Sequence, residues 1–172
     1  MRKSLVALFV LFLSISVVAA CSDSSEAENS EEETEENTEN TDNGWSVSPT
    51  FEVGQSEVRG KENRLAIDNI PFTAKENDTY VIYFWGEQEE LMKGPVKIEA
   101  VHESTGDTEK AIVDYAGTED EEKVWETGSP QVGGDQAHLT VNLSLPYEGL
   151  WRLDVFIADE KFDSIIVEVN EA

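Results

Sequence analysis

Residues 138–157 read HLTVNLSLPYEGLWRLDVFI, and this stretch decides the fold. Aliphatic residues occupy every second position from 139 to 145, and polar residues lie between them. That alternation is typical of a β-strand with one buried and one solvated face. A turn-like PYEG follows at 146–149, and apolar residues then alternate again over 151–157. The stretch therefore predicts two half-buried strands joined by a short turn.

A third strand is expected from Phe162 to Val169, paired with the second as a hairpin. The register is constrained because a slip of one residue would move every side chain to the opposite face. The register that keeps apolar residues together pairs Val155 with Ile165, Leu153 with Val167, and Trp151 with Val169. It leaves a three-residue loop at 159–161, which has no glycine to supply a left-handed position.

Residues upstream supply further strands. Thr79 to Trp85 is apolar at both parities, which is typical of a central strand covered on both faces, so we place it at the centre of the core. The remaining predicted strands span 96–102, 109–115, 64–70 and 45–53, the first two as a hairpin. Residues 116–136 contain no evident strand longer than 123–125, and we expect a long irregular segment there.

These patterns predict an all-β domain over residues 44–172, of a size that suits one hydrophobic core. About seven to eight short strands separated by turns are typical of an immunoglobulin-like sandwich of two sheets. An eight-stranded barrel is the alternative, since it accommodates the same alternation. The sequence has one cysteine, so the core must be stable without an intrachain disulfide.

Residues 1–20 have the features of a signal peptide. Two basic residues precede an apolar run at 5–18, which is shorter than the ~20 residues that span a bilayer. The run leads into Val18, Ala19, Ala20 and Cys21, which resemble the lipobox of bacterial lipoproteins. This resemblance implies cleavage before Cys21 and lipidation of its sulfur, including palmitate-type acyl chains. The predicted location is the extracytoplasmic face of the cell membrane, with the lipid bilayer as the first partner.

Residues 21–43 comprise the lipidated cysteine and an acidic linker. Ten of residues 22–43 are acidic and none is basic or aromatic, so this linker is predicted to be disordered. The whole sequence has 37 acidic and 12 basic residues. Without the ten acidic residues of the linker and the two basic residues at positions 2 and 3, residues 44–172 have 27 acidic and 10 basic residues, a net charge of −17. A surface this negative repels phosphate backbones, so we expect no nucleic-acid partner.

Three stretches resemble the landmarks of a known family: YFWG at 83–86, GGDQAH at 133–138, and LPYEGLWRLDV at 145–155. The family is an uncharacterised one of small lipoproteins from Gram-positive, Bacillus-like bacteria, and the match extends over most of residues 45–170. Relative to the family pattern, this sequence has an extra residue between Asp135 and Ala137, and its acidic run 118–122 resembles an insertion. The resemblance implies a lipoprotein with an immunoglobulin-like domain of unknown function, and it brings no catalytic residues.

The sequence has few side chains in the patterns that catalytic sites require. Cys21 is consumed by lipid, no Gly-x-Ser-x-Gly is present, and the two histidines, His102 and His138, lie in separate predicted strands. We therefore expect no enzymatic activity and no cofactor. His102 has core parity at a strand end and is predicted to be a half-buried, hydrogen-bonded side chain.

Other side chains are candidates for binding. His138 lies on the polar face of its strand beside Asp135. Trp125 and Trp45, at or within irregular segments, are candidates for an exposed aromatic surface. The weak metal candidates are Glu119, Asp120, Glu121 and Glu122, which lack the ligand order of a calcium loop.

Together these features favour a non-catalytic binding or interaction module of the cell envelope. Its partner would be another envelope protein, a cation or a wall polymer. A cation- or metal-binding envelope protein is the alternative, because the domain is strongly acidic. A hydrolase with an unrecognised site is the third hypothesis, since serine, histidine and acidic side chains can assemble in space from distant positions.

Overall fold

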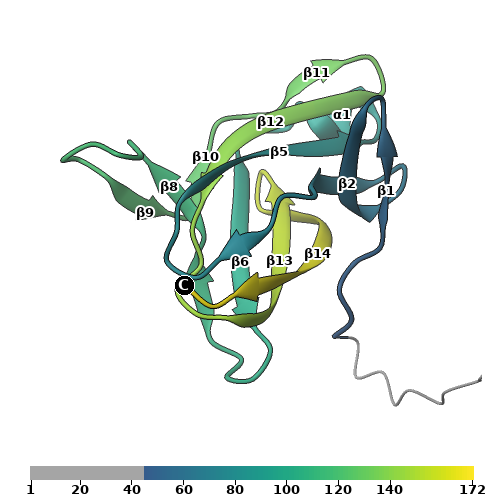
Figure 1. Ribbon diagram of the computed structural model, residues 1–172. Helices are drawn as coiled ribbons and strands as arrows, with labels where there is room; N and C mark the ends of the chain where they lie inside the picture. The colour runs from purple at the N-terminus through teal and green to yellow at the C-terminus, as the bar shows by residue number, and fades with distance from the viewer. Residues whose placement is uncertain (1–44) are drawn as a thin grey trace, which may run out of the picture. The chain divides into compact units, whose positions relative to one another are not determined.

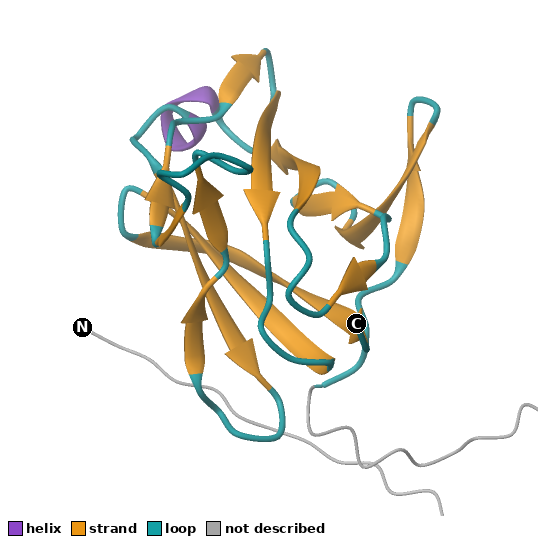
Figure 2. Ribbon diagram, turned by 60° about the vertical axis from the view of Figure 1, so that its left-hand side comes forward, coloured by secondary structure: helices purple, strands orange, loops and turns teal. Residues whose placement is uncertain are grey.

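The computed structural model describes residues 45–172, which form two β-sheets and one short helix (Figures 1 and 2). The elements are β1 (Thr50–Val53), β2 (Ser56–Lys61), β3 (Leu65–Asp68), β4 (Phe72–Thr73), β5 (Asp78–Trp85), α1 (Gln88–Leu91), β6 (Val96–His102), β7 (Thr108–Lys110), β8 (Ile112–Asp114), β9 (Glu122–Val124), β10 (Glu126–Thr127), β11 (Gln131–Gly133), β12 (Gln136–Leu143), β13 (Gly149–Ile157) and β14 (Glu160–Asn170). The prediction of an all-β domain with two sheets is confirmed.

The first sheet has eight strands in the order β1-β2-β3-β5-β12-β8-β9, and β11 also pairs with β12. Its longest pairing joins β5 to β12 over eight antiparallel residue pairs, from Trp85 opposite Gln136 to Asp78 opposite Leu143. β5 therefore lies inside this sheet, where the sequence placed the core centre. Its inward side chains are buried, and its outward apolar side chains, predicted to be covered, are only half-buried.

The second sheet has six strands in the order β10-β6-β13-β14-β4, and β7 also pairs with β6. β13 pairs with β6 and β14 on its two sides, both antiparallel. β4 joins the far side of β14 in parallel, with Phe72 opposite Val169. The short strand β4 thus carries the chain from β3 of the first sheet to the edge of the second and back to β5.

The core fills the space between the inward faces of the two sheets. Trp151, Tyr80 and Phe84 are the largest of its fully buried side chains, each at most 1 % exposed. The apolar positions that alternate along 138–157 are all buried, as the sequence predicts. Burial of one face therefore determines which alternate side chains of β12, β13 and β14 point into the core.

The structure has more strands than the seven or eight expected, because one predicted strand divides and short strands form where none was predicted, among them β2 and β4. Residues 109–115 supply β7 to the second sheet and, after Ala111, β8 to the first. The stretch 116–136 contains β9, β10 and β11, each two or three residues long. Strands this short have too few residues to show an alternation, so no periodic signal identifies them.

The predicted register of β13 with β14 is wrong by two residues. Leu153 lies opposite Ile165 and Trp151 opposite Val167, with the register shifting between Val155 and Phe156. The loop has two residues, Ala158 and Asp159, with φ of 49° and 65°, instead of three. Two consecutive left-handed residues make the turn that matches strand twist, and a bulge beyond it restores the parity.

The predicted signal peptide (1–20), the lipobox with Cys21, and the acidic linker (21–43) lie outside the described residues. Within residues 45–172, no helix has the length and apolar character needed to cross a membrane.

Candidate functional site

The outward face of β5 and β12 carries no acidic, lysine or arginine side chain. Its side chains alternate with buried ones along both strands and are half-buried or exposed. We call this surface the β5–β12 face; it consists of Thr79, Val81, Tyr83, Trp85, Gln136, His138, Thr140 and Asn142. Because residues 44–172 hold 27 acidic side chains, a stretch of central sheet without one differs from the rest of the surface.

Aromatic rings gather at one end of this face. The ring centroids of Tyr83 and Trp85 are 6.2 Å apart with planes inclined by 23°, and Phe51 of β1 lies 6.2 Å from Trp85. The Tyr83 hydroxyl donates a hydrogen bond to Asp68 Oδ1 at 3.3 Å. Asp68 Oδ2 accepts from the Val81 backbone N–H at 2.9 Å, so the carboxylate is itself held in place. The cluster therefore presents aromatic surface in a fixed orientation.

The surroundings of Tyr83 keep its hydroxyl neutral. Partial burial raises its pKa, and the nearby charge of Asp68 raises the pKa further. Both effects disfavour the phenolate. At neutral pH the side chain therefore remains a hydroxyl that can donate as well as accept.

A pocket of about 290 Å³ lies beside Tyr83. In register, His138 lies opposite Tyr83 on one side and opposite Gln131 on the other, so one row crosses β5, β12 and β11. The β11–β12 hairpin turns at Gly134, whose φ of 81° favours glycine. The pocket is lined by Tyr83, Gln131, Val132, Gly133, Gln136 and His138.

The polar groups of this pocket can bind a ligand that has hydroxyl or amide groups. Side-chain hydrogen bonds on the face join Tyr83 to Asp68 and Thr79 to Asn142. Among residues 45–172, none engages the side chains of the pocket's two glutamines or its histidine. Each amide both donates and accepts, and so does a neutral imidazole. The pocket is therefore equipped for a partner with mixed donors and acceptors.

The structure brings one of the three predicted contact residues into this pocket. His138 lines it, whereas Asp135 lies in the exposed β11–β12 turn, where its backbone carbonyl accepts from Gly86 N at 3.3 Å. Trp125 lies between β9 and β10, 37 % exposed, with Lys110 Nζ 5.9 Å from its ring centroid. Sequence reasoning missed Tyr83, because apolar residues on both faces of 79–85 predicted a strand covered on both sides.

The weak metal candidates lie at and next to the end of the β8–β9 hairpin, which extends from the body of the domain in Figure 1. All four side chains are exposed, and Glu121 accepts a hydrogen bond from Gly117 N at 2.7 Å. Within the described part of the chain, no group of three or more histidine, cysteine, aspartate or glutamate residues is placed to hold a metal ion. The hairpin therefore offers scattered carboxylates.

His102 is hydrogen-bonded, as predicted, and is buried rather than half-buried. Its Nε2 lies 3.1 Å from the carbonyl oxygen of Glu148, and its Nδ1 lies 3.2 Å from Ser104 Oγ and 3.4 Å from Thr105 Oγ1. A carbonyl only accepts, so Nε2 carries the proton and a neutral ring accepts at Nδ1. The arrangement ties the β6–β7 turn to the start of β13, with a backbone carbonyl where a catalytic triad would have a carboxylate.

An ion cluster on the second sheet was not expected from the sequence. Asp154 occupies a solvent-facing parity on β13, yet it is 6 % exposed. Its carboxylate accepts from Arg152, from Lys161 Nζ at 2.8 Å and from Ser164 Oγ at 2.6 Å. Burial by itself would raise the pKa of Asp154, but these donors outweigh it and hold the pKa below its ordinary value.

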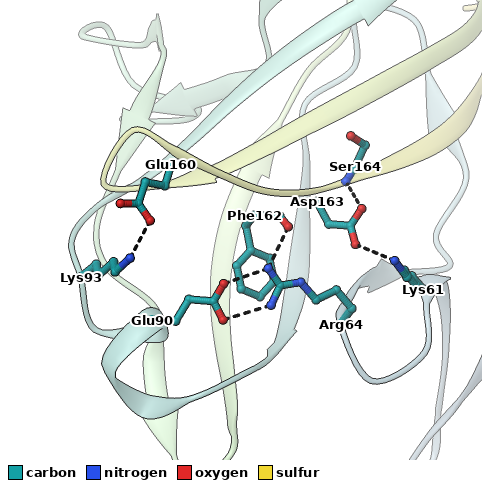
Figure 3. Close-up of polar contacts among 8 residues, drawn as sticks. All are labelled: Lys61, Arg64, Glu90, Lys93, Glu160, Phe162, Asp163 and Ser164. Atoms are coloured by element: carbon teal, nitrogen blue, oxygen red, sulfur yellow. Dashed lines mark hydrogen bonds and ion pairs between the residues drawn. The ribbon is translucent and has the colours of Figure 1, made fainter. Parts of the chain in front are cut away.

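A second polar cluster supports the end of β5 next to the pocket (Figure 3). Arg64 donates to both carboxylate oxygens of Glu90, at 3.0 and 2.9 Å, and to the carbonyl of Phe162. Its guanidinium carbon lies 3.6 Å from the Phe162 ring centroid. The Arg64 carbonyl accepts from Trp85 N at 3.0 Å. These contacts link α1, β14 and β5, and the pairing lowers the pKa of Glu90.

Comparisons with known proteins identify a family and a shared fold. A family model described as "Domain of unknown function (DUF4871)" matches residues 35–167. A crystal structure described as that of a "Putative Lipoprotein from Bacillus anthracis" superposes with a TM-score of 0.62 and 22 % identity, over 73 % of this chain and 86 % of that one. Among curated proteins, no sequence matches significantly. At this identity, the structural match shows a shared fold.

Proposed function

The chain belongs to the DUF4871 family, and from this premise we propose that it is a lipid-anchored binding module of the cell envelope without catalytic activity. The lipobox at Val18–Cys21 supports the anchor. The description of the B. anthracis protein as a lipoprotein agrees with it. The mature domain would then lie on the extracytoplasmic face of the membrane.

The arrangement of strands supports an immunoglobulin-like sandwich. β3-β5-β12-β8 follows the order A-B-E-D, and β6-β13-β14 follows C-F-G, with β4 as a short parallel addition beside G. The immunoglobulin constant-type topology has these two strand orders in its two sheets. Sandwiches of this type serve many binding functions, so the fold is compatible with the proposal and does not select a ligand.

The β5–β12 face is the observation that carries the proposal. It combines half-exposed aromatic rings, a pocket of about 290 Å³ and three polar side chains without partners among residues 45–172. Binding sites typically combine apolar walls with a few polar groups that fix the orientation of a ligand. The Asp68 contact holds the Tyr83 ring before a ligand arrives, and strand pairing places His138 between Tyr83 and Gln131.

The alternative functions have less support. A cation site needs oxygen ligands that converge, and no such group is present among residues 45–172. A hydrolase built on His102 and Ser104 would use an imidazole that is 9 % exposed and oriented by a backbone carbonyl. The structural role of His102 accounts for all of its contacts.

Site-specific photo-crosslinking in the native envelope tests the proposal. A photoreactive amino acid replaces Gln136 in the full-length lipoprotein, and a matched control replaces Glu168, which is exposed on β14 of the other sheet. We expect a discrete adduct from position 136 and none from position 168. Equal labelling at both positions, or no adduct at 136, would contradict a binding site on the β5–β12 face.

A further inference from the structure

The charge of the β5–β12 face restricts its ligand, and this inference rests on the proposed function. None of its eight side chains is Asp, Glu, Lys or Arg, and the Asp68 carboxylate beside Tyr83 already accepts hydrogen bonds from the Val81 N–H and the Tyr83 hydroxyl. A cation would need carboxylates, and a polyanion would need basic groups and would be repelled by a domain of net charge −17. The ligand that this face accepts best is therefore uncharged.

The aromatic cluster adds a second restriction. Tyr83 and Trp85 are both half-buried, with ring centroids 6.2 Å apart and planes inclined by 23°. An aromatic face carries partial negative charge, which suits the weakly positive C–H groups on the face of a pyranose ring. A sugar ring is also polar around its rim, so it can contact the rings while its hydroxyls reach neighbouring side chains.

Those neighbouring side chains supply the matching hydrogen bonds. Gln131, His138 and Tyr83 form one row across three adjacent strands, and Gln136 lies opposite Trp85 in the next row. Strand spacing makes the first row about 10 Å wide. Each of these groups can both donate and accept, as a sugar hydroxyl or acetamido group does, whereas a carboxylate only accepts.

A peptide fits this site less well. Peptides that bind β-proteins commonly add a strand to a sheet edge, where backbone groups are free. At the level of the pocket, β5 is paired with β3 and β12, and β12 is paired with β5 and β11. The backbone groups of β5 and β12 there are used within the sheet, only β11 has a free edge, and the outward face itself presents side chains. We infer that the β5–β12 face binds a neutral glycan, with one pyranose ring on the Tyr83–Trp85 cluster and its hydroxyls on Gln131, Gln136 and His138.

The test is a titration of the full mature lipoprotein in detergent micelles with two neutral probes, the tetramer of β-1,4-linked N-acetylglucosamine and cellotetraose. Calorimetry gives the affinity, and NMR follows the His138 ring. Three variants are compared with the native chain: Tyr83→Ala, Gln136→Ala, and the control Tyr115→Ala, an exposed tyrosine on the β8–β9 hairpin. Gln136→Ala guards against a folding defect in Tyr83→Ala, since it removes only a half-exposed amide.

We expect at least one probe to bind, with a shift of the His138 resonances. Tyr83→Ala and Gln136→Ala should each weaken binding by about tenfold or more, as truncation of a central contact does, while Tyr115→Ala should leave it unchanged. Equal binding by all variants would overturn the inference. If neither probe binds but position 136 still crosslinks to an envelope protein, the glycan is excluded and the binding module stands. If both experiments fail, the proposed function fails as well.

Discussion

Asp154 shows how a single residue can depart from its sequence pattern. Its parity on β13 is that of a solvated side chain, yet Arg152, Lys161 and Ser164 enclose its carboxylate on the outer face of the second sheet. A buried carboxylate is tolerated only where donors replace its hydration. The sequence contains those donors at distances of two to ten residues, but only the β13–β14 pairing brings them to one point.

Replacement of that carboxylate should destabilise the domain in a pH-dependent way. Because folding lowers the pKa of Asp154, its contribution is present above the unfolded-state pKa and is lost as the pH falls through the folded-state value. We expect Asp154→Asn to lower the free energy of unfolding by about 1–3 kcal/mol at pH 7. The difference from the native chain should shrink below about pH 4. Urea unfolding at both pH values measures it, with Glu168→Gln as an exposed control; a gap independent of pH would contradict this assignment.

The β13–β14 hairpin shows what an element's sequence does and does not determine. Alternation identified both strands and their buried faces, because burial leaves a period of two in the sequence. The register depends on the turn, and Ala158 and Asp159 lack the Asn-Gly signature that usually marks a left-handed pair. The register was therefore predicted two residues away from the observed pairing, with the correct parity.

The same turn provides a test of backbone strain. Asp159 is exposed and has a φ of 65°, a conformation that costs a side chain energy and a glycine little. We expect Asp159→Gly to raise the free energy of unfolding by about 0.4–1 kcal/mol, net of the glycine's greater unfolded entropy. Glu168→Gly, at an extended strand position of the same hairpin, should instead lower it. Thermal unfolding compares the two; destabilisation by Asp159→Gly would show that the observed turn is wrong.

At the scale of the whole molecule, the sequence predicted the two-sheet core better than the candidate site. The alternation of apolar and polar residues identifies core residues such as Trp151, and all the predicted inward positions of β12 and β13 are buried. The site required knowledge of which apolar positions stay uncovered. Tyr83 and Trp85 are apolar at the outward parity of β5, and a pattern cannot distinguish a covered face from an open one. His138 was identified because it is a titratable side chain on the polar face of a predicted strand.

The proposed membrane location of the protein gives a separate prediction. Cys21 is the one cysteine, so lipid attachment through a thiol has no alternative position in this sequence. We expect the native chain to incorporate a palmitate analogue and to sediment with membranes, because two acyl chains anchor a protein stably. Cys21→Ala should abolish both properties, while Ser24→Ala should change neither. Membrane association of Cys21→Ala equal to that of the native chain would rule out the lipid anchor.

The central claim, that the β5–β12 face is occupied in the envelope, can be measured with the chain's own two histidines. His138 is exposed in the pocket, whereas His102 is 9 % exposed and serves as an internal reference. Diethylpyrocarbonate modification, read by mass spectrometry, reports the accessibility of each ring. We expect His138 to react rapidly in the purified lipoprotein and to be protected on intact cells, with His102 slow in both. Equally rapid reaction of His138 on cells and in the purified protein would contradict the account.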